Sequence, residues 1–114
     1  LAEPGSAYND TVLGKDPCPA TMDDYVTTKQ DNGGVHINCT IPSHAFYLGS
    51  IELGGYAWIK LGEVWYKTLL NKLDKNSNFV DFADSTLQVS RKINGQGSRI
   101  TKALNRAWKK VKIL

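Results

Sequence analysis

His36 and Asp31 lie five residues apart in the stretch DNGGVHIN, a spacing that could bring a carboxylate against an imidazole. A carboxylate that accepts from one imidazole nitrogen fixes the tautomer and favours the charged ring, and the other nitrogen then points outward as a donor. Between them, Asn32 supports the loop, and Gly33 and Gly34 allow a sharp turn and close approach of another group. Because an acid that orients a histidine recurs in catalytic sites, we interpret this stretch as a candidate catalytic loop.

The remaining titratable residues form no second site by their spacing. His44 follows His36 by eight residues and is expected to be a surface or packing residue of a helix. Two histidines without an HExxH motif or a well-spaced third ligand do not make a zinc site. Asp23 and Asp24 are adjacent, so on a helix they diverge by about 100° and act as first-turn charges rather than as an acid pair. We therefore expect no metal site in this chain.

The two cysteines, Cys18 and Cys39, are not spaced like zinc-finger ligands. They form either one disulfide or two free thiols, and the sequence alone favours neither. A bridge would close a loop of about 20 residues and stabilise the fold by roughly 3 kcal/mol in the chain-entropy model.

Length and composition fit one globular domain. The chain has 114 residues, of which 41% are hydrophobic, so a single core is expected and wholesale disorder is not. No apolar run approaches the roughly 18–20 residues that a membrane span needs, and no signal-peptide pattern is present. The chain does not begin with methionine, so we expect a processed piece or a fragment of a longer protein.

Charge is distributed unevenly along the chain. Residues 1–84 hold all 11 acids, whereas residues 85–114 hold no acid and eight basic residues: Arg91, Lys92, Arg99, Lys102, Arg106, Lys109, Lys110 and Lys112. Such a segment could bind nucleic acid or an acidic partner, or it could be the solvated face of a helix. The second interpretation is favoured because the apolar residues of this segment already form a regular core stripe.

The N-terminal third of the sequence reads as irregular and the rest as helical. Residues 1–38 are rich in Pro, Gly and polar residues, which break helices and strands, although Thr21 could cap one helical turn in TMDDY. No convincing alternation typical of strands is present. We predict an all-α fold of about four main helices in residues 39–114, behind an irregular segment over residues 1–38 that carries the histidine loop.

Four helices are predicted from apolar spacing and from end signals. Gly54-Gly55 and the stretch NGQGS are expected to end helices, and Asn78 and Ser98 to cap the N-termini of the last two. The final helix has the most regular stripe. The expected core-facing residues, helix by helix, are Ile41, Ala45, Phe46 and Leu48; Ala57, Leu61, Val64, Trp65 and Leu69; Phe79, Phe82, Ala83, Thr86 and Ile93; and Ile100, Ala103, Leu104, Ala107, Trp108 and Val111.

The stretch DNGGVHIN, followed by IPSHAFYL and GGYAWIKLGEVWYKTL, closely resembles the C-terminal domain of thermolysin-like zinc metallopeptidases. The opening LAEPGSAYNDTVLGKDPCPATMDDY resembles the lead-in to that domain, and GQGS and ALNRAWKKV match the shape of its last two helices. The resemblance covers nearly all of residues 1–114. It implies a helical domain that forms one wall of an active-site cleft.

The resemblance also implies roles for individual residues. His36 matches the family histidine that donates to the oxyanion as the peptide carbonyl becomes tetrahedral, and Asp31 matches the aspartate that holds it. The zinc ligands, the HExxH glutamate that acts as general base, the calcium ligands and the substrate-pocket arginine belong to an N-terminal half upstream of Leu1. We therefore expect this chain to pair with that zinc-binding domain to hydrolyse peptide or protein substrates, to be inactive alone, and to be secreted.

The sequence departs from the family pattern in several places. Cys39-Thr40 stands where the family often has Ser-Gly, and Cys18 stands at a position that is commonly polar but not cysteine. A bridge between these cysteines would pin the irregular segment beside the His36 loop. The basic final helix is also atypical, and it supports an alternative function as a stand-alone helical module that binds an acidic partner or, less favoured, nucleic acid. A membrane partner is not expected.

Overall fold

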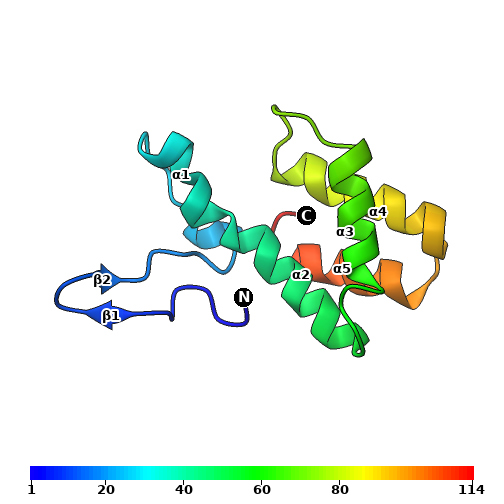
Figure 1. Cartoon of the computed structure of the whole chain (residues 1–114), viewed down its shortest axis with the longest axis horizontal. Helices are drawn as coiled ribbons and strands as arrows, with labels where there is room; N and C mark the ends of the chain where they lie inside the picture. The colour runs from blue at the N-terminus through cyan, green and yellow to red at the C-terminus, as the bar shows by residue number, and fades with distance from the viewer.

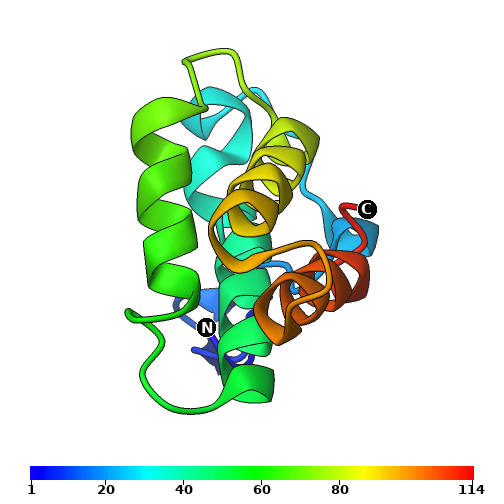
Figure 2. The same cartoon turned by 90° about the vertical axis from the view of Figure 1, so that its right-hand side faces the viewer.

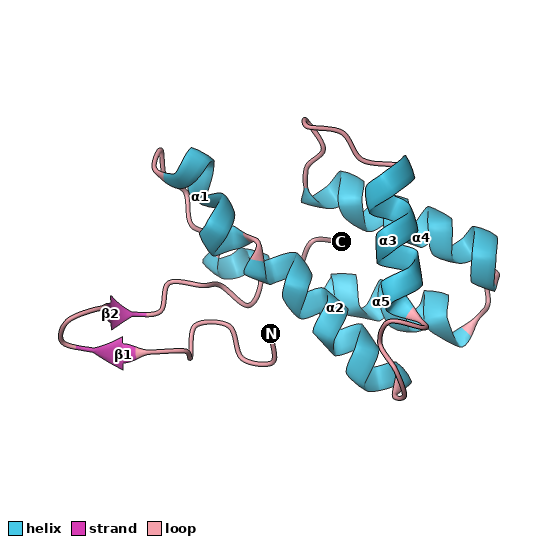
Figure 3. Ribbon diagram, in the orientation of Figure 1, coloured by secondary structure: helices cyan, strands magenta, loops and turns pink.

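The fold is built from helices, as the sequence predicts, with one very small β-hairpin (Figures 1 and 3). The computed structural model describes residues 1–114. The elements, in chain order, are β1 (Asn9–Asp10), β2 (Gly14–Lys15), the 3₁₀ helix η1 (Met22–Asp24), α1 (Asp31–Asn38), α2 (Thr40–Leu53), α3 (Leu61–Asn71), α4 (Phe79–Asn94) and α5 (Arg99–Lys110). The four longer helices α2 to α5 confirm the all-α prediction.

The N-terminal segment is less irregular than its composition suggests. The antiparallel pair of β1 and β2 encloses a turn in which Asp10 Oδ1 accepts from the backbone N–H groups of Val12 and Leu13, each at 2.7 Å. Two residues per strand are too few to produce an alternating pattern in the sequence, which is why the hairpin was not predicted. Thr21 caps η1 as expected, because its side chain accepts from the backbone N–H of Asp23.

Two helical elements, η1 and α1, lie within the segment over residues 1–38 that is predicted to be irregular. Helix α1 is unusual, and it is the stretch that carries His36. In Figure 1 the segment of residues 1–30 and α1 extend to one side of the packed body formed by α2 to α5.

The ends of the last two helices follow the predicted signals. Asn78 caps α4 in a reciprocal capping box with Asp81, and Gly95 ends this helix with a φ of 92°. Ser98 then caps α5 by accepting from the backbone N–H of Thr101. Local side-chain chemistry therefore sets the register of these helices.

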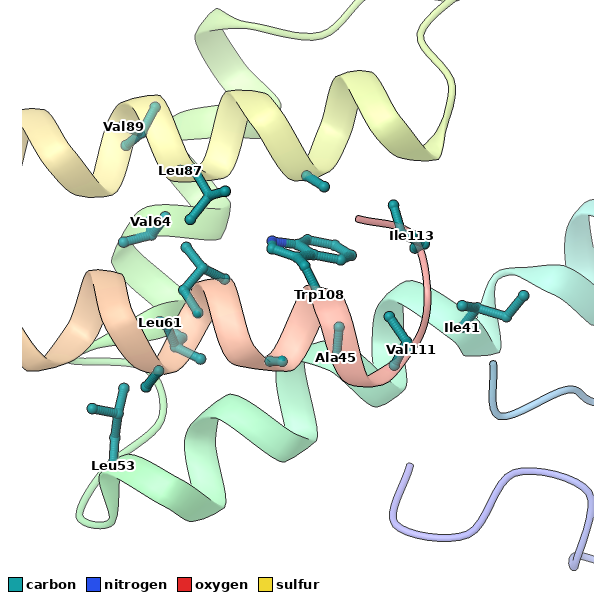
Figure 4. Close-up of a cluster of buried hydrophobic side chains, with 14 residues drawn as sticks. Ile41, Ala45, Leu53, Leu61, Val64, Leu87, Val89, Trp108, Val111 and Ile113 are labelled. Carbon is teal, nitrogen blue, oxygen red and sulfur yellow. The ribbon is translucent and has the colours of Figure 1, made fainter. Parts of the chain in front are cut away.

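The core lies where α2, α3, α4 and α5 meet (Figures 2 and 4). All five predicted stripe residues of α5 after Ile100 are buried: Ala103, Leu104, Ala107, Trp108 and Val111. The indole of Trp108 is fully buried, and its Nε1 donates to Thr86 Oγ1 on α4 at 2.8 Å. The Trp108 ring also stacks on Trp65 of α3 at 5.2 Å between centroids, so one side chain joins three helices.

Two predicted core residues are wrong. Leu69 is 55% exposed and Ile93 is 37% exposed. The residue before Leu69, Thr68, is buried instead. Its hydroxyl donates to the Val64 carbonyl at 2.8 Å, so the buried polar group is hydrogen-bonded. Ala57 precedes α3 instead of lying within it. None of the helices is long and apolar enough to cross a membrane.

Candidate active site

The stretch DNGGVHIN forms one left-handed turn followed by one right-handed turn. Asp31, Asn32, Gly33 and Gly34 have φ values of 52°, 49°, 88° and 77°, four consecutive residues in the left-handed region. The backbone N–H groups of Gly33 and Gly34 both donate to the Gln30 carbonyl at 3.0 Å. The sharp turn expected from the two glycines is therefore present, and it also includes Asp31 and Asn32, residue types that tolerate this region better than most.

The two glycines meet different surroundings. A Cβ on Gly33 would have no neighbour within 4 Å, whereas a Cβ on Gly34 would lie 3.0 Å from Asn38 Nδ2 and 3.1 Å from Thr28 Cγ2. Gly33 is thus required for its conformation alone. Gly34 is required for its conformation and for close packing against residues 26–28.

Asp31 holds His36 with both carboxylate oxygens. Oδ1 lies 2.5 Å from the imidazole Nδ1, and Oδ2 accepts from the His36 backbone N–H at 2.7 Å. The left-handed turn makes this possible, because it folds the chain back so that residue 31 reaches residue 36. With Nδ1–H donating to the carboxylate, Nε2 is the ring atom left for an outside group.

The site is open on the side of the histidine. The His36 side chain is 86% exposed, while that of Asp31 is 28% exposed. The hydrogen bond that the imidazole donates to Asp31, together with the negative charge of that carboxylate, raises the pKa of His36 above its ordinary value of 6.5. In return, the hydrogen bonds from the His36 side chain and backbone lower the pKa of Asp31. The pair therefore favours the charged imidazole, in which Nε2–H is the donor left for an outside group.

Asn38 supports the histidine loop, and the sequence analysis did not predict this role. It is 2% exposed, and its amide pairs with the backbone of Val26, as Oδ1 accepts from the Val26 N–H and Nδ2 donates to the Val26 carbonyl, both at 2.9 Å. This clamp fixes the end of α1 against the preceding segment. In the sequence, the only indication of this clamp is that Asn38 is a polar residue directly before a predicted apolar helix. A helix N-cap has the same pattern.

An apolar hollow of about 610 Å³ is lined in part by Asn32 and Gly33 of the turn. Its lining includes Met22, Tyr25, Asn32, Val35, Cys39 and Phe79. The hollow therefore joins η1, the histidine loop and the N-terminus of α4.

The other candidate residues lie apart from this site. His44 Nδ1 lies 2.7 Å from the Leu1 carbonyl and its ring stacks parallel to Tyr47, in keeping with the packing role expected for it. Asp23 and Asp24 lie in the first turn of η1. Asp23 forms an ion pair with Lys112 near the C-terminus.

Both cysteines carry free thiols in the structure, with Cys18 half-buried and Cys39 exposed. They nevertheless come from neighbouring segments, because Thr40 Oγ1 donates to the Pro19 carbonyl at 2.8 Å. Of the two predicted alternatives, the structure has the two free thiols, and they lie in adjoining segments.

The residues of this chain do not fit a zinc site. No group of three or more His, Cys, Asp or Glu side chains lies close enough together to hold a metal ion. His36, the one histidine in the candidate site, uses Nδ1 on Asp31.

The basic final helix is partly engaged within the molecule. Arg106 forms an ion pair with Glu52 of α2, and Arg99 Nη2 donates to the Glu52 carbonyl at 2.9 Å. Lys102, Lys109 and Lys110 are exposed. Part of the basic surface therefore joins α5 to α2, and the rest faces solvent.

Comparisons with known proteins point to one family. The family model described as "Thermolysin metallopeptidase, alpha-helical domain" matches residues 1–113. The chain is 50% identical over 93 residues to an extracellular metalloprotease of Pectobacterium carotovorum subsp. carotovorum. This alignment covers 81% of this chain and 27% of that protein. It is also 46% identical over 116 residues to protease PrtS of Photorhabdus sp. (strain Az29), in an alignment that covers 99% of this chain and 31% of that protein.

A solved structure has the same fold. The precursor of protealysin, a metalloproteinase from Serratia proteamaculans, superposes with a TM-score of 0.90 at 45% identity, over 99% of this chain and 35% of that chain. The chain thus spans about a third of the length of these relatives. With a family model matched over residues 1–113 and a common fold, the chain belongs to the thermolysin-like metallopeptidases, of which it is an α-helical domain.

Proposed function

We propose that this chain is the C-terminal half of a zinc metalloendopeptidase and supplies the histidine that stabilises the transition state. In this proposal, Nε2 of His36 donates to the peptide carbonyl oxygen as that oxygen gains negative charge, and Asp31 orients the ring. Such donors act strongly because they are preorganised where charge develops. The remaining site residues, Asn32, Gly33 and Gly34, form the turn that brings Asp31 to His36.

The observation that carries the proposal is the double contact from Asp31 to His36. A carboxylate that only neutralised an exposed imidazole would need one contact, whereas here the second oxygen also fixes the backbone of the same residue at 2.7 Å. The raised pKa of His36 matches the task, since a cationic donor is attracted to an oxyanion more strongly than a neutral one. The exposed face of the ring leaves Nε2 accessible to a partner domain and its substrate.

The other parts of the reaction lie outside this chain in the proposal. The family resemblance assigns the zinc ligands and the general base to an N-terminal half, together with any calcium sites. That half would be the principal partner, peptide or protein the substrate, and the chain alone would cleave nothing. Several relatives are named extracellular metalloproteases, which supports secretion of the full-length protein.

The test is the pair of variants His36→Ala and His44→Ala in the full-length protein. Because both remove one histidine but only His36 faces the proposed substrate, we expect His36→Ala to lower kcat by roughly 10²–10³ and His44→Ala to leave it within about twofold. Zinc content, measured by elemental analysis, should equal that of the wild type in both variants.

The outcomes separate the explanations. An unchanged kcat in His36→Ala would remove the assignment. Loss of zinc in that variant would instead make His36 a structural or metal-site residue, which also contradicts the proposal.

A further inference from the structure

Cys18 and Cys39 belong to segments that are fastened together at the next residue of each. Thr40 Oγ1 donates to the Pro19 carbonyl at 2.8 Å, so the residues that follow the two cysteines are in direct contact. Burial, the neighbouring Asp16 and, least, the charge of Cys39 all raise the pKa of the Cys18 thiol. Cys18 and Cys39, 21 residues apart in the sequence, therefore lie in adjoining segments of the fold.

The two thiols differ in environment. Cys39 is exposed at the junction of α1 and α2, and its Sγ lies 3.4 Å from the His36 carbonyl. Cys18 is half-buried, and Asp16 accepts from its backbone N–H at 3.0 Å. Burial is the largest cause that raises the pKa of the Cys18 thiol. Cys39 is thus the thiol that a soluble reagent reaches, and Cys18 is the more buried thiol in the adjoining segment.

The position of the pair relative to the proposed active site gives it a consequence. Cys39 follows α1 directly and lies three residues after His36. The segment of Cys18 leads into η1, whose Met22 N–H donates to the Val111 carbonyl near the C-terminus at 3.0 Å. A covalent link at Cys18 and Cys39 would therefore join the anchored N-terminal segment to the end of the histidine-bearing turn.

We infer that Cys18 and Cys39 form a reversible dithiol–disulfide pair that locks the N-terminal segment to the α1–α2 junction when oxidised by a low-molecular-weight disulfide. The Cys39 thiolate attacks one sulfur of glutathione disulfide, the glutathione S–S bond breaks, and one glutathione thiolate leaves and takes up a proton. The Cys18 thiolate, having lost its proton to solvent, attacks the Cys39 sulfur and expels the second glutathione. Two cysteine thiols are oxidised to one disulfide, and one glutathione disulfide is reduced to two thiols.

The test is to equilibrate the full-length protein in defined glutathione buffers, alkylate the free thiols, and map peptides by mass spectrometry. In oxidising buffer the wild type should yield a peptide pair linked through Cys18 and Cys39, which separates on reduction. The Cys18→Ser variant should instead keep glutathione on Cys39, because no Cys18 thiol remains to displace it. The Cys39→Ser variant should leave Cys18 open to alkylation.

Two results would overturn the inference. One is a wild type that ends as a stable glutathione adduct on Cys39 with Cys18 alkylated, as in the Cys18→Ser variant. The other is a linked form whose folded half-life at elevated temperature, followed by tryptophan fluorescence, does not exceed that of the reduced form; we expect an increase of roughly tenfold that is absent from the double serine variant. Neither measurement requires peptidase activity, so failure here leaves the proposed role of His36 untouched.

Discussion

Asp31 contacts His36 at two atoms, the ring Nδ1 at 2.5 Å and the backbone N at 2.7 Å, across a turn of four left-handed residues. The turn and the contact depend on each other. The positive φ values fold residue 31 back toward residue 36. Without the carboxylate, the backbone N–H and the ring N–H of His36 would both lose their acceptor within the protein. The geometry of the histidine is therefore a property of the turn as a whole.

The first prediction concerns pH. The pKa of His36 is raised by Asp31, so the folded protein holds that proton to higher pH than the unfolded chain does. The stabilisation from this shift is complete below about 6.5 and is lost as pH rises through the raised value. Asp31 behaves oppositely, because its lowered pKa gives stabilisation above about 3.8 that is lost as pH falls through the lowered value.

The variant Asp31→Asn tests this linkage in the full-length protein. Removing the negative charge should lower the pKa of His36, so the alkaline limb of the kcat/KM profile should move to lower pH as well as drop in height. Asp24→Asn, which changes an exposed acid in η1, is the matched control and should leave the limb in place. An alkaline limb at the same pH in Asp31→Asn would show that His36 does not set it.

The second prediction concerns the two glycines of the turn. Gly33→Ala places a Cβ in open space at positive φ, so we expect a loss of about 1 kcal/mol in the free energy of unfolding. Gly34→Ala adds a clash with the Asn38 amide and Thr28, and should cost about 2–4 kcal/mol. Chemical denaturation of the full-length variants measures both values. Equal losses in the two variants would contradict the close packing of Gly34 against Asn38 and Thr28.

The third prediction concerns the buried hydrogen bond between α4 and α5. Thr86→Val keeps the side-chain shape but removes the acceptor for Trp108 Nε1, leaving a fully buried N–H unpaired. We expect a loss of about 1–3 kcal/mol in the free energy of unfolding. Thr27→Val at an exposed position is the control and should change stability by less than about 0.5 kcal/mol. Similar small effects from both variants would contradict the role of this bond.

Much of the helical fold could be predicted because its signals are local. Asn78, Gly95 and Ser98 act on groups within a few residues, so their types alone place the ends of α4 and α5. The stripe of α5 was also readable, since that helix is surrounded by core on one side and solvent on the other.

Other features depend on contacts that a single stretch of sequence does not contain. Leu69 fits the apolar period of α3, yet its exposure is set by which neighbours α3 packs against, and Thr68 takes the buried place by bonding its own helix. Similarly, the spacing predicts the pairing of Asp31 with the His36 ring. The second contact, to the His36 backbone N–H, depends on the left-handed turn, which the spacing does not predict. The clamp from Asn38 to Val26 spans 12 residues and leaves no periodic trace.

The measurement that tests the central claim most directly compares catalysis with binding of a tetrahedral phosphonate analogue of the transition state. It uses the full-length wild type with His36→Ala, His36→Gln and the control His44→Ala. If His36 donates only to the developing oxyanion, the loss in kcat/KM should be matched by an equal loss in affinity for the phosphonate, while KM stays nearly constant. Phosphonate affinity that is unchanged in His36→Ala while kcat/KM falls would contradict the account.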